Sequence, residues 1–486
     1  MSKKPVRTQD IPLWMAFVPL VVLMILLGGA VSIFGDGASS GPNQIGLMTA
    51  AAVACLIGLL RGQSWRELEK AIVDGIMLAM PACLILLMIG ALIGSWMLAG
   101  TAPAIIHLGL GILDPAWFYP ATMIVCALVS VSIGSSWTTA ATVGLALIGI
   151  AQILGLSPAI TAGAIISGAY FGDKMSPLSD STNLAPAMVG VDLFVHIRHL
   201  FWTTTPSFIL ALILFIWLSW GNENILSDGG DIDTARDLLE QNYAMGLPAF
   251  LPLALLLGLS IKKVPALPTI TLGAVAGCLV AALYQTEATR RFGDANGLLS
   301  EGTALMKGLW VALSNGYQAS TGDTSLDELL SRGGMSSMLT TIWLIISAMC
   351  FGGAMEHTGL LSRIVLTALK GVRSTGSLIF TTVLTSIGMN IIAADQYISI
   401  VLPGRMYQME FKRRKLAPEN LSRTLEDAGT MTSALVPWNT CGAFMAATLG
   451  VPTFSYLPYA FLNLFNPVIA IIYGFLNFRM TPLDEK

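Results

Sequence analysis

The chain has 486 residues, of which 54% are hydrophobic and only 11% are charged. A soluble domain carries about a quarter charged residues, so a soluble core this apolar would leave too few charges to cover its own surface. The composition therefore excludes an ordinary soluble protein, and the net charge of −3 gives no reason to expect a nucleic-acid partner.

From the N-terminus, the first apolar segment is 13–33, and crossing a bilayer as a helix takes about 20 such residues. Charges precede it without a small-residue cleavage site after it, so we predict a retained helix and not a signal peptide. Gly, Pro and charges separate the later apolar runs, which favours helices over an outer-membrane barrel. We expect single crossings at 13–34, 46–60, 75–98, 158–190, 200–219, 247–261, 267–284, 335–357, 427–449 and 455–477, and re-entrant hairpins at 118–150 and 376–404.

The two halves of the chain share features in the same order. Gly75, Gly94 and Gly100 match Gly334, Gly353 and Gly359, each 259 residues further on. Ser132-Ile133-Gly134 matches Ser386-Ile387-Gly388 after 254 residues, and Gly172 matches Gly429 after 257. We predict an all-α membrane protein built as an inverted repeat, with five transmembrane helices plus one re-entrant helical hairpin per half and broken helices at the midplane. The repeats span 1–221 and 244–486, joined by an acidic outer linker at 222–243.

The distribution of Lys and Arg tests the orientation of this arrangement, because cytoplasmic loops contain more Lys and Arg than the loops on the other side of the membrane. With the N-terminus inside, few of the 26 basic residues fall outside, namely Arg236, Arg290, Arg291, Lys307 and Arg332. We therefore expect a multi-pass protein of the bacterial inner membrane with both termini cytoplasmic. Straight spans in place of the hairpins would put the basic run 412–415 outside.

The densest polar interruption of an apolar segment is 168–183. Pro177 removes a backbone donor and clashes with the carbonyl four residues earlier, so we expect the helix to open near Asp173. Freed carbonyls could then join polar side chains around a small cation, since hard cations prefer oxygen ligands; these side chains are Asp180, Ser181, Thr182 and Asn183. The alternative is a polar loop outside the membrane.

Three further polar segments interrupt the membrane regions. They are 134–139 with Ser136 and Thr139, 390–395 with Asn390 and Asp395, and 430–440 with Asn439 and Thr440. We expect the four breaks to meet in one central site. Asp395 is either a site residue or an acid neutralised by a buried partner.

Four other titratable residues are expected to lie outside the central site. Glu426 and Asp427 begin a predicted crossing and are expected to cap its helix N-terminus, where acids suit the helix dipole. His196 and His199 are expected in an inner loop.

The segment Gly172-Asp173-Lys174-Met175-Ser176-Pro177-Leu178-Ser179-Asp180-Ser181-Thr182-Asn183-Leu184-Ala185 closely resembles the NhaC family of bacterial sodium/proton antiporters. Pro437-Trp438-Asn439-Thr440-Cys441-Gly442 is similar to the same family, and length and hydropathy agree over nearly the whole chain. One departure is Ser181, where the family pattern often has Thr. The resemblance implies inverted repeats, re-entrant hairpins and a homodimer with a scaffold and a moving transport domain. It also implies that relatives within the family exchange malate and protons for lactate and sodium.

We predict exchange of sodium ions for protons, with Asp180, and Asp173 as second candidate, binding either ion. A nearby cation favours the ionised carboxylate, so one ligand expels the other. Lys174 could offset the charge of Asp173 or add to the positive inner face. We expect no cofactor, since sodium is the transported substrate.

The rival function is an organic-acid exchanger, whose anion would need Lys174, Arg405 or amides such as Asn183. An enzyme is not expected, because the sequence has no HExxH, no Gly-x-Ser-x-Gly elbow and no Walker loop.

Overall fold

The computed structural model describes residues 11–220, 230–294 and 296–483, and these are helical apart from connecting segments and one isolated bridge. The helices are α1 (Leu13–Phe34), α2 (Pro42–Leu60), α3 (Trp65–Leu98), α4 (Thr101–Ile112), α5 (Phe118–Ile133), α6 (Ser136–Thr139), α7 (Leu145–Ile153), α8 (Pro158–Met175), α9 (Asp180–Val189), α10 (Leu193–Ser219), α11 (Gly230–Asn242), α12 (Leu251–Ile261), α13 (Ala266–Tyr284), α14 (Thr286–Gly293), α15 (Glu301–Ser314), α16 (Thr324–Leu330), α17 (Leu339–His357), α18 (Leu360–Lys370), α19 (Thr375–Ile392), α20 (Gln396–Arg413), α21 (Pro418–Leu425), α22 (Met431–Ser433), α23 (Thr440–Leu449), α24 (Thr453–Tyr456) and α25 (Phe461–Leu476). Two π-helical turns, η4 (Ala140–Gly144) and η8 (Glu426–Thr430), connect α6 to α7 and α21 to α22.

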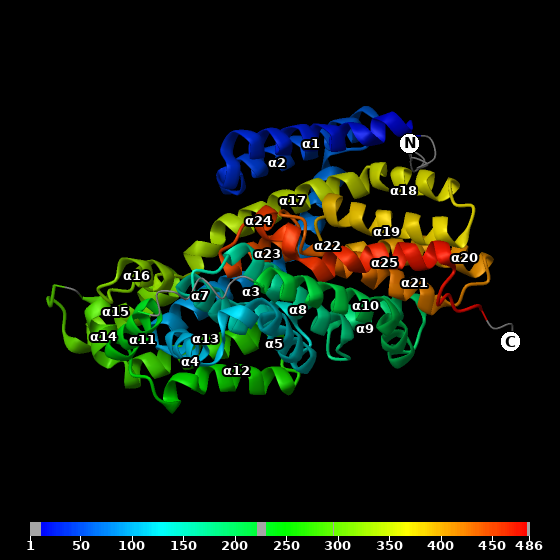
Figure 1. Ribbon diagram of the computed structural model, residues 1–486. Helices are drawn as coiled ribbons and strands as arrows, with labels where there is room; N and C mark the ends of the chain where they lie inside the picture. The colour runs from blue at the N-terminus through cyan, green and yellow to red at the C-terminus, as the bar shows by residue number, and fades with distance from the viewer. Residues whose placement is uncertain (1–10, 221–229, 295, 484–486) are drawn as a thin grey trace.

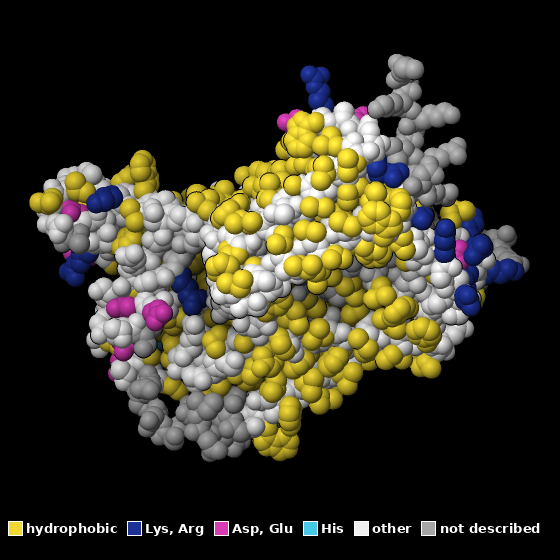
Figure 2. Space-filling view, turned by 90° about the horizontal axis from the view of Figure 1, so that it is seen from above, with side chains coloured by type: hydrophobic (Ala, Val, Ile, Leu, Met, Phe, Trp, Pro, Cys, Tyr) yellow, Lys and Arg dark blue, Asp and Glu magenta, His cyan; other side chains and the backbone are white. Residues whose placement is uncertain are grey.

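Within the described ranges, nine helices are long and apolar enough to cross a membrane, or up to eleven if each of two bent helix pairs counts as one crossing. Helices suit this solvent because lipid cannot satisfy backbone N–H and C=O groups. The protein is a multi-pass membrane protein. Large apolar side chains such as Trp14, Leu60 and Leu283 are exposed on its surface, and Figure 2 shows hydrophobic side chains spread over the body of the molecule.

The helices form two groups (Figure 1). α1 and α2 lie side by side along one edge, α17 packs against both α2 and α3, and α3 in turn packs against α13. The second group contains α5, α8, α10, α19, α20 and α25, while α14 to α16 gather at one end of the molecule. The site described below lies within the second group, which therefore positions its residues.

Several helices begin earlier than the hydropathy predicted. α3 begins at Trp65 and not at 75, because Ser64 and Glu67 form a capping box. α10 begins at Leu193 and not at 200, because the Asp192 carboxylate accepts hydrogen bonds from two backbone N–H groups of its first turn. His196 and His199 are consequently buried helix residues, so their expected place in a loop was wrong.

The predicted cap at Glu426 and Asp427 was also wrong. The helix already begins at Pro418, a residue suited to a first helical position, and the two acids lie in the π turn η8 that continues it. Both side chains are completely buried. The predicted crossing began too late because the helical turns 418–426 contain Arg423, whose charge lowers the local hydropathy. The Arg423 side chain is nevertheless buried.

The predicted outer linker is in part a helix. Its residues 222–229 lie outside the described residues, but α11 occupies 230–242 and packs against α4 and α7. The short helices α4, α14, α15, α16 and α18 were not predicted either.

Local structure repeats at one spacing along the chain. Residues 259 or 260 positions apart occupy the same place at the end of a helix. The pairs are the left-handed N-cap glycines Gly100 and Gly359, the last helical residues Ile133 and Ile392, the N-caps Ser179 and Asn439, and the C-cap glycines Gly190 and Gly450. The predicted match of Gly134 with Gly388 was wrong, since Gly134 ends a helix and Gly388 lies inside α19.

The repeated elements α8 and α21–α22 contact each other in opposite directions. Tyr170 lies against Ser433, whereas Lys174, one turn further along α8, lies against Asp427, earlier in the chain. Antiparallel contact is the relation that an inverted duplication requires of equivalent crossings.

Candidate functional site

Asp173 is the centre of the first polar cluster. It lies on the last turn of α8 and is buried. The Ser136 hydroxyl donates to its Oδ2 over 2.6 Å, and the Ser179 hydroxyl donates to its Oδ1 over 2.6 Å. Ser136 begins α6 and Ser179 caps α9, so hydroxyls from two different helix breaks meet on one carboxylate. A carboxylate with hydroxyl neighbours is an oxygen-only set of the kind that hard cations prefer.

Close packing of α5 on α8 brings these two breaks together. Met123 faces Gly168 and Ser130 faces Gly172, so the helices run in parallel, and a Cβ on either glycine would come within 2.3 Å of α5. α5 then ends at Gly134, which has a left-handed φ of +76°. Both chain breaks therefore lie at the same level.

The α8 helix opens later than predicted. The Ser176 N–H still donates to the Gly172 carbonyl over 2.9 Å, so the break covers 176–179 and leaves Asp173 inside the helix. Pro177 removes the hydrogen bond to the Asp173 carbonyl, and the Thr182 hydroxyl replaces it over 2.7 Å. The break is thus compensated by a side chain from the next helix.

The other residues predicted around this break have different roles. Thr182 also donates to the Lys174 carbonyl, and the Asn183 amide donates to the carbonyls of Pro177 and Ser179 over 2.9 and 2.6 Å. The Ser181 hydroxyl lies 3.2 Å from that of Ser179. Thr182 and Asn183 therefore hold the broken backbone, and Asn183 is exposed.

Asp180 lies on the first turn of α9 and is exposed. It remains within electrostatic range of Asp173. Its carboxylate therefore lies at the edge of the cluster and not at its centre.

The second-half break is built from amides. The Asn390 amide donates to the Gly429 carbonyl over 2.7 Å and to the Thr432 hydroxyl over 2.9 Å. The Asn439 amide donates to the backbone carbonyl and the side-chain oxygen of Asn390, each over 3.1 Å. Its own oxygen accepts from the Cys441 N–H over 3.0 Å as the N-cap of α23. These amides bind each other and the backbone.

Asp395 is buried as the N-cap of α20, where its Oδ1 accepts from the Ile398 N–H over 3.0 Å. Backbone donors thus partner this acid, and the Thr440 N–H binds the neighbouring Ala394 carbonyl over 2.9 Å. Thr139, by contrast, turns its hydroxyl to the Ser135 carbonyl in its own helix.

The structure brings the first-half and second-half breaks together. Trp137, next to Ser136, stacks on Phe444 of α23 with ring centroids 4.0 Å apart. The Tyr170 hydroxyl lies 3.4 Å from that of Ser433. Tyr397 on α20 is within electrostatic range of the three carboxylates Asp173, Asp180 and Asp395.

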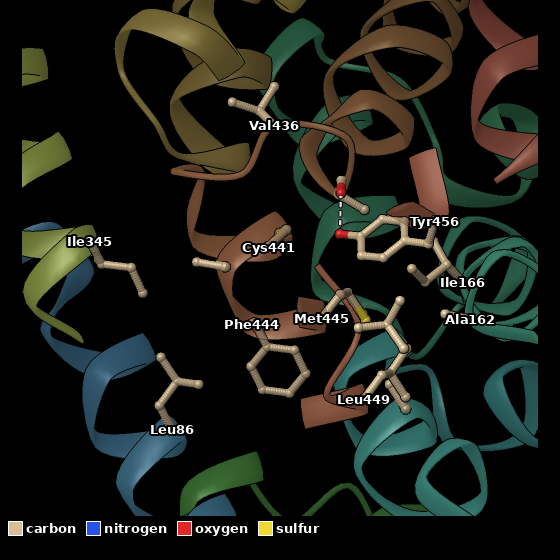
Figure 3. Packing of buried hydrophobic residues seen from close by; sticks show 14 of the residues in the cluster. Leu86, Ala162, Ile166, Ile345, Val436, Cys441, Phe444, Met445, Leu449 and Tyr456 are labelled. Atoms are coloured by element: carbon tan, nitrogen blue, oxygen red, sulfur yellow. Dashed lines mark hydrogen bonds between the residues drawn. The ribbon is translucent and has the colours of Figure 1, made fainter. Parts of the chain in front are cut away.

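The short helix α23 is also where the two helix groups meet. Figure 3 shows Phe444 and Met445 between Leu86 on one side and Ala162 and Ile166 of α8 on the other. α23 contacts α3 and α17 as well as η4 and α22. The site is therefore anchored against the first helix group by apolar packing.

A buried ionic cluster next to the site was not predicted. The Lys174 ammonium is completely buried and binds Asp427 Oδ1 and Asn466 Oδ1. The Thr203 hydroxyl donates to the same Asp427 oxygen over 2.8 Å, and Arg423 Nε lies 3.9 Å from Asp427 Oδ2. Lys174 therefore neither offsets Asp173 directly nor belongs to a surface face. The spacing of Arg423 and Asp427, one helical turn apart, was the available sequence signal.

The comparisons with known proteins agree with this architecture. The model of the Na+/H+ antiporter family matches residues 168–478. The chain is 38% identical over 434 residues to the Na(+)/H(+) antiporter NhaC of Alkalihalophilus pseudofirmus, covering 89% of this chain and 90% of that protein. It is 36% identical to the malate-2H(+)/Na(+)-lactate antiporter of Bacillus subtilis over 96% of both chains. It is 37% identical to the arginine/ornithine antiporter ArcD of Halobacterium salinarum, covering 87% of this chain and 84% of that protein.

The matched region begins at Gly168 and contains both helix breaks that carry the predicted motifs. Similarity to the NhaC protein extends over nearly nine-tenths of each chain. The predicted NhaC resemblance is confirmed, and this chain belongs to the Na+/H+ antiporter family.

Proposed function

We propose that this protein exchanges sodium ions for protons across the bacterial inner membrane by alternating access, with sodium bound at Asp173. The observation that carries this proposal is the buried Asp173 carboxylate with the Ser136 and Ser179 hydroxyls 2.6 Å away. We place Asp173 ahead of Asp180 as the ion-binding acid, because Asp180 is exposed. No cofactor and no catalytic reaction belong to the proposal, since sodium is cargo.

The charges around the site favour a cation over an organic anion. An anion would need a free cationic partner, but Lys174 is engaged by Asp427 and Asn466, and Arg405 is exposed. The helix N-termini at the breaks already carry oxygen caps from Ser135, Ser179, Asp395 and Asn439. Each cap uses an N–H group that could otherwise bind a carboxylate.

Alternating access is supported by the duplicated helix breaks and by the antiparallel contact of α8 with α21–α22, because two inverted copies can exchange conformations around one site. We place both termini in the cytoplasm. Figure 2 shows Lys and Arg at both ends of the molecule, with the denser group at the end where Figure 1 places α20 with its terminal Lys412 and Arg413. A homodimer is part of the proposal on family resemblance, and crosslinking in membranes tests it.

The test is sodium-driven proton movement in proteoliposomes containing a pH-sensitive dye. Asp173→Asn removes the ligand charge, and we expect exchange to fall by more than about 100-fold, beyond the effect of losing an outer-shell partner of a bound metal. Asp180→Asn is the matched variant, and we expect a smaller loss because its carboxylate is exposed. Normal exchange by Asp173→Asn would remove that residue from the ion site.

The organic-acid alternative is tested in the same vesicles. Relatives with names for malate/lactate and arginine/ornithine exchange are as similar to this chain as the sodium/proton antiporters. Labelled malate, lactate, arginine and ornithine are therefore added one at a time. Two results together would contradict the proposed function. They are sodium-dependent uptake of one of these compounds, and no sodium-driven proton movement when that compound is left out.

A further inference from the structure

Glu426 is a completely buried acid that the proposed sodium site does not use. It begins the π turn η8, and neither of its carboxyl oxygens has a hydrogen-bond partner among the described residues. The Thr430 hydroxyl, one turn further on, interacts with the acid, but it does not lie in hydrogen-bonding geometry to either oxygen. An ionised carboxylate in this place would lose its hydration without any compensating bond, at a cost of several kcal/mol.

The charges near Glu426 balance only if it is neutral. Lys174 and Arg423 contribute two positive charges, and Asp427 and Asp173 contribute two negative ones. With the Glu426 carboxyl protonated, this group of buried residues has no net charge. A sodium ion on Asp173 would add one positive charge, and loss of one proton would restore the balance.

The position of Glu426 suits such a coupling. It acts electrostatically on Lys174, the residue next to Asp173, and on Asp173 itself, and it makes no hydrogen bond to the predicted sodium ligands. Added positive charge favours the ionised form of a nearby acid. π turns of this kind are often found at functional sites, because they break the regular hydrogen-bond ladder.

The turn η8 also packs against α9, α10, α19, α20 and α25. The titratable and charged side chains of these helices are Asp180, His196, Arg198, His199, Tyr397, Arg405, Tyr407, Glu410, Lys412, Arg413 and Tyr473, while α19 contains none. Two of these, His196 and His199, are buried beside Ser422 and Arg423.

We propose that Glu426 carries the transported proton while Asp173 carries sodium, so that the two ions use different acids coupled by charge. The inference rests on the proposed function. Sodium binding at Asp173 releases the proton of the Glu426 carboxyl to water on the open side, leaving a carboxylate. Sodium release on the other side is followed by proton uptake from water there, which restores the neutral acid.

The test compares two kinds of flux in proteoliposomes. Glu426→Gln keeps the shape of the neutral acid but cannot release a proton. We expect sodium-driven proton movement to fall on the order of 100-fold, the scale on which a proton-transfer group contributes. Exchange of radioactive sodium for unlabelled sodium, which needs no proton, is expected to continue. Sodium affinity of this variant, measured at pH 6 and pH 8, should lose the pH dependence of the wild type.

Controls make each outcome decisive. Glu356→Gln changes an exposed Glu at the end of α17 and should leave both fluxes unchanged. Glu426→Asp keeps an acid one methylene shorter and should exchange with a displaced pH profile, which carries the test if Glu426→Gln does not fold. Normal proton movement by Glu426→Gln, loss of sodium self-exchange in a folded variant, or an unchanged pH profile for Glu426→Asp would overturn the inference. A wild-type protein without sodium-driven proton movement would overturn the proposed function itself.

Discussion

The two pairs of helix breaks occupy equivalent places in the chain but differ in chemistry. At the first, hydroxyls of Ser136 and Ser179 converge on a carboxylate. At the second, the amides of Asn390 and Asn439 bind one another and the backbone. The chain therefore opens at matching places in its two halves, whereas the side chains at the two openings differ. We infer that the first break binds the ion and the second supports it.

The largest effect on stability is expected at the buried ion pair between Lys174 and Asp427, which connects the two halves of the chain. Lys174→Met leaves the buried Asp427 without its main partner, and breaking a buried pair costs about 3–5 kcal/mol. The thermal unfolding midpoint in detergent should fall sharply. The double variant Lys174→Met with Asp427→Asn should recover most of this loss, because no uncompensated charge remains.

Lys370→Met provides the matched control, since that side chain is exposed at the end of α18. An unfolding midpoint for Lys174→Met equal to that of the control would show that the buried ion pair does not join the halves.

An intermediate effect separates the two breaks directly. Asn439→Ala removes an N-cap and leaves buried groups of Asn390 unpaired, so we expect a loss of about 2–3 kcal/mol. Ser179→Ala removes only a weaker cap, for about 1 kcal/mol, but should weaken sodium binding roughly tenfold or more. Unfolding midpoints and sodium titrations of both variants measure this contrast. Equal losses of sodium affinity in the two variants would contradict the division of roles.

The smallest effects are expected at two glycines that share a sequence motif. Gly388→Ala lies inside α19 with open space around it, so alanine should stabilise by about 0.5–1 kcal/mol. Gly134→Ala needs a left-handed residue, which costs about 1–2 kcal/mol, and its Cβ would lie 2.6 Å from that of Leu178. The two unfolding midpoints should therefore move in opposite directions, and a shift of the same sign would contradict the different backbone positions of the two glycines.

Much of the fold could be predicted from hydropathy and from the positions of proline, glycine and polar interruptions. The crossings at 13–34 and 335–357 have the predicted bounds, and all four polar interruptions coincide with helix breaks. Helix starts were less accurate at α3, α10 and α21, because polar turns such as 65–74 contain charges that hydropathy excludes although local caps extend the helix through them. The inverted orientation and the sodium ligands remain predictions.

The sequence by itself determined that the protein lies in a lipid bilayer, which family it belongs to and where the backbone opens. The length of apolar segments and the positions of proline and glycine can be read locally along the chain. Only the tertiary structure decided which polar side chains meet. Thr182 and Asn183 satisfy the backbone, and Lys174 pairs with Asp427 more than 250 residues away. Neither carboxyl oxygen of Glu426 has a hydrogen-bond partner in the part of the chain that the structure describes. Such pairings depend on how helices from the two halves pack, and residue order along one chain carries no direct record of those distances.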